Sequence, residues 1–435
     1  MKNTAQNEKS VFGESPSGWS VDRIRDRLKD VIGGEWGDDP NAHDDGTLIP
    51  VIRVADIQGL DVSTANLTIR RVKNSKLHER LINKKTILIE KSGGGELKPV
   101  GRAVLGRNIS EDAICSNFMA KVDCADKIYP LFIAYLLETT YSSGINTAHI
   151  QQTTGIQNLR VADYLNTKVA FPDLKEQQLI ADYLDASCAA IDSAIGCKSK
   201  QIESLKELRA AWFHQIFSNK SWPQERIKDI VLKIGSGVTP DGGAANYLDH
   251  GIPLIRSQNV TFEGLKLDDV AYISEDTHKL MSNSQLKPCD VLLNITGASI
   301  GRCTYVPEEF GEANVNQHVC IIRCNHKIDY RFLAAFLQSP VGQNQVFSSF
   351  TGASRQGLSH KELGLMTIPL PEIEIQVKVV EEFDKKLLSH KQIQSCIEKQ
   401  IAALLAYRRS LIHECVTGRR RVTEADVKKV REHGW

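Results

Sequence analysis

The chain has 435 residues, of which 41% are hydrophobic and 25% are charged, and its net charge at pH 7 is +1. This composition excludes a disordered chain, and the near-zero charge means that any binding of nucleic acid would depend on local patches or on partner chains. The N-terminal residues lack the apolar segment of a secretion signal and no long apolar run follows, so we expect a cytoplasmic protein without membrane contact. The ten cysteines are expected to be reduced thiols.

The predicted elements alternate between mixed globules and long helices. Short β-branched runs between Gly and Pro predict α+β globules, with helices near residues 129–139 and 330–338. Two stretches almost free of Gly and Pro predict long helices. The expected segments are a disordered N-terminus (1–13), a globule (14–172), a helix (173–220), a globule (221–371), a helix (372–417) and a basic tail (418–435). Basic tails of this kind are more often solvated surface helices than nucleic-acid-binding arms.

The second globule and helix repeat the first. The matches keep the same order, and their offset drifts by only a few residues, as insertions and deletions in surface loops would cause. Examples are Trp19, Ile24 and Asp26, which recur as Trp222, Ile227 and Asp229, and Ile49–Arg53, which recurs as Ile252–Arg256. The chain is therefore interpreted as a tandem duplication.

Both long helices carry apolar residues at alternating spacings of three and four, which predicts a coiled-coil seam. At 1.5 Å per residue each helix would be about 66 Å long. The predicted seam includes Ile191, Ile195, Ile202, Leu205 and Arg209 in the first helix and Ile397, Ile401, Leu404 and Arg408 in the second. A helix that returns from the second globule can pair with the first helix only in antiparallel orientation, which predicts a rod between the globules. Its seam arginines are expected to fix the register.

Residues 297–301 match G-x-S-x-G, the pattern around the nucleophile of many serine hydrolases. That pattern needs a strand before the serine and a helix after it, whereas the β-branched residues 302–307 predict a second strand. The equivalent segment of the first copy, residues 93–101, has two matching glycines and no serine at the equivalent position. We therefore expect a flexible turn at Ser299 and no catalytic residue, with a hydrolase as a disfavoured alternative.

Two histidines and two cysteines, His318, Cys320, Cys324 and His326, lie close together in the sequence. Their apolar, β-branched surroundings predict a strand, on which the two histidines would be about 26 Å apart. A single zinc ion cannot bridge that distance. We expect a half-buried strand and no metal site.

Two similar globules joined by long helices suit a long, repetitive ligand such as DNA, whose helical repeat is roughly 34 Å. The chain resembles the specificity (S) subunits of type I restriction-modification systems from about residue 14 to 418. The residues that carry the likeness are Gly18-Trp19, Ser221-Trp222, Ile252–Arg256, Asp290–Leu293, Lys91–Gly95, Pro172–Gln178, Pro369–Gln376 and Val416–Gly418. Ile375 departs from the family pattern, because it interrupts the usual acidic-Gln pair at the start of the second helix.

The resemblance implies a tandem duplication of an α+β target recognition domain, each copy followed by a long helix, with the two helices in an antiparallel coiled coil. Each domain would bind one half of a bipartite, gapped site in double-stranded DNA. The helices would set the spacer and dock two methyltransferase (M) subunits, and restriction (R) subunits would join the full complex. S-adenosylmethionine, ATP and Mg would belong to those partners. The chain itself would bind no cofactor and catalyse nothing, and it has no phosphate-binding loop or Rossmann fingerprint.

Candidate DNA contacts follow from chemistry: Arg suits guanine, Asn and Gln suit adenine, and Lys, hydroxyls and glycine-loop N–H groups suit phosphates. The candidates are Arg53, Gln58, Lys91, Ser92, Gly93, Gly94, Arg102, Gln157, Arg256, Gln258, Asn259, Asn294, Thr296, Ser299, Arg302, Arg355 and Gln356. For each, the alternative is a solvated or turn-capping polar residue. For the whole chain, the alternative is a coiled-coil DNA-binding protein or protein adaptor of another defence system.

Overall fold

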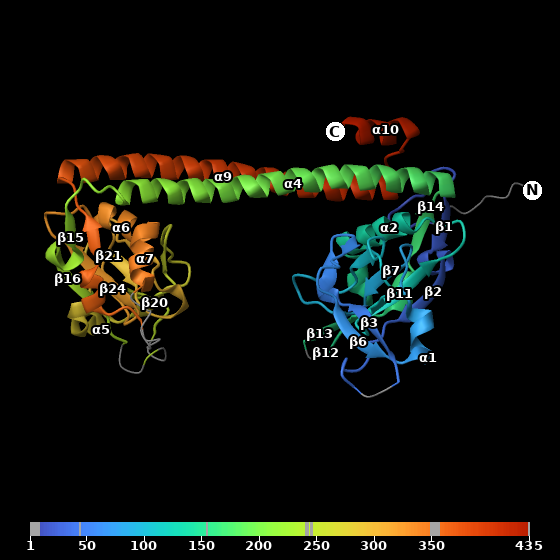
Figure 1. Cartoon of the computed structure of the whole chain (residues 1–435), viewed down its shortest axis with the longest axis horizontal. Coiled ribbons are helices and arrows are strands. Elements are labelled where there is room, and N and C mark those ends of the chain that lie inside the picture. Colours follow the sequence, from blue (N-terminus) through green and yellow to red (C-terminus); the bar gives the residue numbers. More distant parts are fainter. Residues whose placement is uncertain are drawn as a thin grey trace, which may run out of the picture. The chain divides into compact units, whose positions relative to one another are not determined.

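A computed structural model describes residues 9–42, 45–153, 155–239, 243, 247–348 and 357–433. The chain divides into two compact units: unit 1 comprises Met1–Cys197 and Lys399–Trp435, and unit 2 comprises Lys198–Glu398. Each unit contains a mixed globule and a part of each long helix (Figure 1). The expected fold class is confirmed.

The globule of unit 1 is built from small sheets. Their strand orders are β2(Leu28–Gly33)-β11(Met119–Cys124)-β7(Ile87–Glu90)-β9(Ala103–Leu105), β10(Ile114–Cys115)-β3(Thr47–Ile52)-β6(Thr68–Val72), β12(Ile150–Thr153)-β13(Ile156–Leu159)-β8(Ser92–Gly93), β1(Ser20–Arg23)-β14(Lys168–Phe171) and β4(Ile57–Gln58)-β5(Asp61–Val62). Its helices are α1(Asn74–Leu77), α2(Pro130–Ser142) and α3(Val161–Leu165). In Figure 1, α2 lies between the long helices and the strands, and its apolar residues join one core with α4 and β7.

Unit 2 repeats this plan. Its strand orders are β16(Val231–Ser236)-β24(Val319–Cys324)-β21(Val291–Asn294)-β22(Cys303–Tyr305), β20(Ala271–Ile273)-β17(Ile252–Ile255)-β23(Asn314–Val315), β15(Gln224–Arg226)-β25(Thr367–Pro369) and β18(Val260–Thr261)-β19(Gly264–Leu265). Its helices are α5(Glu275–Leu280), α6(Tyr330–Gln338), α7(Pro340–Ser348) and α8(His360–Leu365). The expected helices near residues 129–139 and 330–338 are therefore confirmed as α2 and α6.

Strand register confirms the duplication residue by residue. In unit 1 Ile114 pairs in parallel with Val51, and in unit 2 Asn314 pairs in parallel with Leu254. Gly34 and its counterpart Gly237 both press against the backbone at the end of β10 or β23. A Cβ atom would lie 2.1 Å from the carbonyl oxygen of Ser116 in unit 1, and in unit 2 it would lie 1.7 Å from that of Val315. Both positions need glycine because the backbones approach so closely.

The long helices are α4(Leu174–Phe217) and α9(Ile373–Val416), and each continues from one unit into the other. In unit 1 the beginning of α4 packs against the end of α9, with Leu184 and Leu411 in one core. In unit 2 the end of α4 packs against the beginning of α9, where the ring of Trp212 stacks on Phe383 at 5.3 Å. The pairing is antiparallel within each unit, as predicted. All nine predicted seam residues are buried or half-buried.

One glutamine at the start of each long helix attaches that helix to the globule that precedes it in the chain. The side-chain oxygen of Gln177 accepts a hydrogen bond from Tyr129 N at 2.9 Å, and that of Gln376 accepts one from Asp329 N at 2.9 Å. Both side chains are buried and also donate to the carbonyl oxygen of the preceding proline, Pro172 or Pro371. These motif residues therefore position the helices.

Both ends of the chain pack against unit 1. Val11 N donates to the carbonyl oxygen of Lys168 at 2.9 Å, so packed structure begins before residue 14. In the tail, α10(Glu424–His433) packs on unit 1: Val427 is buried, and Arg431 forms an ion pair with Asp182 of α4 at 2.9 Å. The tail is thus a docked helix and not merely a solvated one.

The cysteines and the helices of the described ranges bear on two expectations, reduced thiols and the absence of a membrane-spanning segment. All ten cysteines are free thiols, and Cys320 is fully buried in β24, which confirms the predicted strand. No helix of the described ranges is long and apolar enough to cross a membrane.

Candidate nucleic-acid interface

The loops that leave the strands of each globule converge on one edge, which we call the loop edge. It comprises residues 34–37, 53–58, 91–101 and 116–118 of unit 1 and residues 237–239, 256–259, 295–301 and 316–318 of unit 2. In unit 1 these loops surround a hollow of about 400 Å³, the unit 1 hollow. Its lining residues are Trp36, Arg53, Val54, Ala55, Ser92, Gly93, Ser116, Asn117 and Phe118. The structure therefore brings the predicted residues Arg53, Ser92 and Gly93 together.

The loop edge of unit 2 holds a chain of hydrogen bonds instead. Thr296 Oγ1 lies 2.5 Å from His318 Nδ1, and Gln317 Nε2 lies 3.0 Å from His318 Nε2. Gln317 also accepts a hydrogen bond from Thr239. We call these four residues the unit 2 polar chain. Strand register makes His318 the counterpart of Phe118, because each immediately precedes the strand that pairs with β7 or β21.

The predicted arginines fall into two groups. Arg53 donates to Asp56 at 2.8 Å, and this hydrogen bond raises the pKa of Arg53. Arg102 donates to the buried Glu90 at 2.8 Å, a bond that raises the pKa of Arg102 in the same way. These guanidinium groups already have carboxylate partners, so part of their hydrogen-bonding capacity is occupied.

Of the counterparts in unit 2, Arg256 has a longer ion pair, with Asp269 at 3.6 Å, and Arg302 has none with the described residues. Arg256 donates to the carbonyl oxygen of Asp269 at 3.2 Å and lies 5.7 Å from the ring centre of Tyr247. Arg302 is exposed, and its side chain has neither an ion pair nor a hydrogen bond with the residues that the structure describes. The side chain at the position equivalent to Glu90 is Asn294, which explains the missing ion pair.

Three of the predicted amides are buried and hold the loops together. Asn259 donates to the carbonyl oxygen of Lys266 at 2.8 Å, and Asn294 donates to that of Ser257 at 2.7 Å. Gln157 accepts from Val100 N at 3.2 Å. Their side chains are turned inward, so in this conformation they shape the loop edge and do not face a ligand. Gln58 and Gln258 remain exposed.

The glycine turns differ between the units. In unit 1, Ser92 donates to Asn158 at 2.7 Å, and Gly94 adopts a positive φ of 65°. Half-buried Lys91 precedes this turn. In unit 2, residues Gly297–Ser299 form a single 3-10 turn between β21 and β22, so the predicted strand, turn, strand is confirmed. Within the described residues no hydrogen bond joins Ser299 to a histidine, and the hydrolase arrangement is not formed. Arg355 and Gln356 lie outside the described residues.

Sequence reasoning missed the aromatic and polar residues that differ between the two loop edges. Trp36 and Phe118 are 82 positions apart and meet only in the fold. In unit 2 the sequence places His318 in a group of His and Cys residues, and only the fold shows its bond with Thr296. The internal repeat could have indicated these residues. Their positions differ in chemical type between the two copies, whereas the flanking strands are similar.

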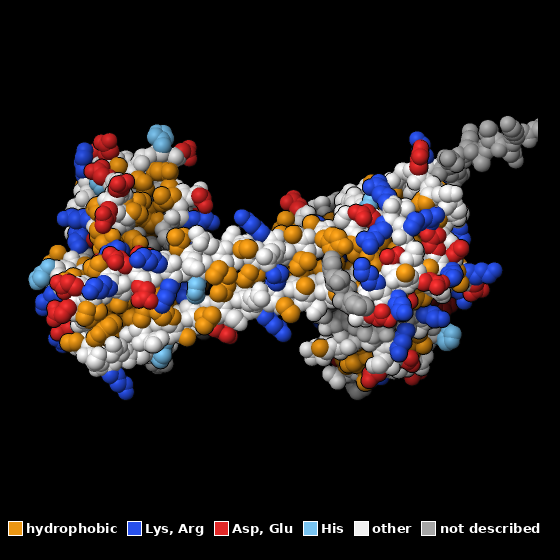
Figure 2. Space-filling view, turned by 90° about the horizontal axis from the view of Figure 1, so that it is seen from above, with side chains coloured by type: hydrophobic (Ala, Val, Ile, Leu, Met, Phe, Trp, Pro, Cys, Tyr) orange, Lys and Arg blue, Asp and Glu red, His pale blue; other side chains and the backbone are white. Residues whose placement is uncertain are grey.

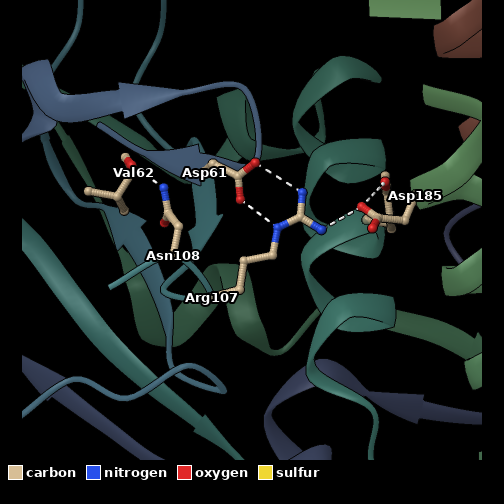
Figure 3. A network of polar contacts seen from close by, with 6 residues as sticks. Asp61, Val62, Arg107, Asn108 and Asp185 are labelled. Carbon is tan, nitrogen blue, oxygen red and sulfur yellow. Dashed lines mark hydrogen bonds and ion pairs between the residues drawn. The ribbon is translucent and has the colours of Figure 1, made fainter. Parts of the chain in front are cut away.

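A polar network fixes the globule of unit 1 to α4, as Figure 3 shows. Arg107 donates to both carboxylate oxygens of Asp61, at 2.6 and 2.9 Å, and also to Asp185 of α4. Its neighbour Asn108 donates to the carbonyl oxygen of Val62. The hydrogen bonds that Arg107 donates to Asp61 raise the pKa of Arg107, so the guanidinium group stays charged. This clamp orients the β4–β5 hairpin, whose first strand belongs to the loop edge.

Charge on the displayed face is mixed. Figure 2 views the molecule from the side of the long helices, and Lys and Arg side chains alternate there with Asp and Glu. This face carries no broad field of a single sign, in agreement with a net charge of +1.

The chain has two α+β globules in tandem and two long paired helices, and the loop edges of the globules differ in chemistry. This arrangement defines a recognition protein with two binding domains. The family model described as "Type I restriction modification DNA specificity domain" matches residues 16–204 and 219–399. The chain belongs to this family, and it is a DNA specificity subunit with two tandem recognition domains.

Similar proteins agree with this assignment. The chain is 24% identical over 337 residues to the type I restriction enzyme EcoBI specificity subunit of Escherichia coli, covering 71% of this chain and 70% of the relative. It is 24% identical over 440 residues to the MjaVIII specificity subunit of Methanocaldococcus jannaschii, covering 96% of each.

Two solved structures share the fold. One, from a study of complex assembly and conformational transition of the type I R-M system, has a TM-score of 0.73 at 14% identity and covers 93% of this chain and 98% of the other. The HsdS subunit from Thermoanaerobacter tengcongensis has a TM-score of 0.52 at 14% identity with the same coverage.

Proposed function

We propose that each unit binds one half of a bipartite, gapped site in double-stranded DNA through its loop edge. The helices α4 and α9 set the unspecified spacer and dock two M subunits, and R subunits complete the restriction complex. This chain contributes recognition only. The partners bring S-adenosylmethionine, ATP and Mg, and the complex acts in the cytoplasm.

One observation carries this proposal: the two units share their strand register but present different side chains at matched positions of the loop edge. The hollow with Trp36 and Phe118 in unit 1 is replaced by the polar chain with His318 in unit 2. A protein that reads two unlike half-sequences needs one scaffold twice and two different sets of contacts. Identical loop edges would instead suit a palindromic site.

The long helices support the spacer role. Each has 44 residues, which at 1.5 Å per residue corresponds to about 66 Å, or roughly two turns of DNA. The predicted seam residues are buried or half-buried along both helices, so separating the helices would expose an apolar stripe to water.

The decisive experiment is to co-express the full chain with a matching M subunit and to map N6-methyladenine across the host genome. We expect one motif with two defined halves and a constant gap. The M subunit expressed without this chain is the control, and it should leave no such motif. A single contiguous motif, or no motif, would contradict the proposal.

Salt dependence gives a second test. Binding of the purified complex to a duplex with the mapped motif should weaken steeply as salt rises, because phosphate contacts release counterions. A protein adaptor that binds no DNA would show no such association at any salt concentration.

A further inference from the structure

The unit 1 hollow presents an apolar surface close to two arginine side chains. The side chain of Phe118 is 44% exposed, and Trp36 lines the hollow beside it. The guanidinium group of Arg53 borders the hollow, and that of Arg70 lies 5.0 Å from the ring centre of Trp36. An exposed phenylalanine next to cations suits a ligand that carries both an apolar group and negative charge.

The matched positions of unit 2 have the opposite character. Phe118 is replaced by His318, whose ring nitrogens bond with Thr296 and Gln317, and Trp36 is replaced by Thr239. The backbones at these positions agree, because Gly34 and Gly237 make the same close approach to the neighbouring chain. The difference is therefore one of side-chain chemistry on a common frame.

Among the base edges exposed in the major groove of DNA, thymine alone adds a methyl group, and apolar side chains such as Phe are suited to contact it. A phenylalanine ring offers no hydrogen-bond donor to a phosphate or to a carbonyl oxygen. The cations around the hollow, Arg53 and Arg70, suit the phosphates that flank any base.

We propose that Trp36 and Phe118 read the C5-methyl group of a thymine in the half-site bound by unit 1. Unit 2 reads its half-site through hydrogen bonds from His318 and Gln317 and makes no methyl contact at the matched position. This inference rests on the proposed function and deepens it, since it assigns the base chemistry that distinguishes the two domains.

The test uses the complex of the full chain with its M subunits and duplexes that carry the mapped motif. Each thymine is replaced in turn by deoxyuridine, which lacks only the methyl group, and affinity is measured by competition. We expect one replacement in the half bound by unit 1 to weaken binding about fourfold, the effect of exposing one buried methyl group. Replacements in the other half should leave affinity unchanged.

Two matched variants test which residue is responsible for the preference for thymine. Phe118→Ala should bind the thymine and deoxyuridine duplexes equally, because the methyl group has lost its contact. His318→Ala, at the equivalent position of unit 2, should keep the fourfold preference for thymine and weaken binding through the other half-site. Both side chains lie at the loop edge, and thermal unfolding of each variant checks that its fold is retained.

The outcomes separate this inference from the proposed function. If a gapped motif is found but no deoxyuridine replacement weakens binding, or if Phe118→Ala keeps the preference for thymine, the methyl contact is overturned and the half-site assignment stands. A half-site for unit 1 without thymine also overturns it. If no gapped motif is found, the proposed function fails first.

Discussion

Arg408 of α9 donates a hydrogen bond to Glu138 of α2 at 2.6 Å. The same guanidinium group lies 3.4 Å from Asp192 of α4, so one side chain joins both long helices to the globule of unit 1. Its counterpart in the repeat, Arg209, meets Gln338 at 3.4 Å and has no carboxylate at that position. Both arginines contact their globules, so they do more than fix the register of the seam.

Replacing Glu138 with Gln should destabilise unit 1. The change keeps the shape of the side chain and removes the negative charge, leaving Arg408, 14% exposed, with only the more distant Asp192. We expect the free energy of unfolding to fall by about 2 kcal/mol. Urea unfolding followed by circular dichroism measures this difference.

The repeat supplies the matched control. Gln338→Glu places a carboxylate near Arg209, whose pKa is lowered by burial, and should stabilise unit 2. If both substitutions changed stability in the same direction, the ion pair would not account for the difference between the units.

Replacing Arg107 with Ala should loosen the hairpin beside the loop edge. The side chain bridges Asp61 and Asp185, and without it the two carboxylates lose their shared partner. We expect faster hydrogen exchange of the backbone amides at residues 57–62 and a loss of stability near 1 kcal/mol, since the network is about one-third exposed.

Arg226→Ala is the control for this loss. It removes a pair with Asp229 three residues away, which lies within one short local segment of the chain, so exchange should rise only locally. Unchanged exchange at residues 57–62 in Arg107→Ala would show that the clamp does not hold the hairpin.

The pKa of His413 provides a pH-dependent prediction. Burial and the nearby Arg419 lower this pKa below its ordinary value of 6.5. The unfolded chain therefore takes up a proton more readily than the folded chain, and stability should fall as pH drops below about 6.5. In His413→Gln the dependence of unfolding free energy on pH between 7.5 and 5.5 should be shallower, by up to about 1.4 kcal/mol per pH unit. An unchanged slope would exclude His413 as a source of the pH dependence of stability.

The sequence predicted the elements that repeat but not the partners of individual side chains. Seam positions such as Leu205 and Leu404 follow from helical periodicity, which is local. The pairing of Arg102 with Glu90 depends on the alignment of β7 with β9, where Ile89 lies opposite Ala103. Strand register is not encoded in any local pattern. The sequence therefore predicts Arg102 as a DNA contact and does not reveal its ion pair with Glu90.

At the loop edges, too, the sequence does not predict which side chains come together, with one exception. Trp36 and Phe118 belong to distant loops that meet because β10 pairs with β3 and Gly34 packs against the following chain. No spacing rule joins them. The pair Arg53 and Asp56, by contrast, is three residues apart and could have been anticipated as a local ion pair.

The arginines that follow the two glycine turns allow a direct test of structural against DNA-binding roles. Arg102 and Arg302 occupy the same place in the repeat. The backbone N–H of Glu90 donates to the carbonyl oxygen of Arg102 at 2.8 Å, and that of Asn294 donates to the carbonyl oxygen of Arg302 at 2.8 Å. Arg102→Ala would leave the carboxylate of Glu90, 1% exposed, without its cation. We expect this variant to lose about 3 kcal/mol of folding stability, because an unpaired buried charge is costly.

Arg302→Ala should behave in the opposite way. Its exposed side chain has no partner among the described residues, so folding stability should stay within about 0.5 kcal/mol of the parent. DNA affinity of the complex should fall, and the slope of log affinity against log salt should decrease by about one if the contact is to a phosphate. Equal affinity of Arg302→Ala and parent at low salt would remove Arg302 from the interface. A stable Arg102→Ala with weakened DNA binding would mean that the first-copy arginine leaves Glu90 when DNA binds.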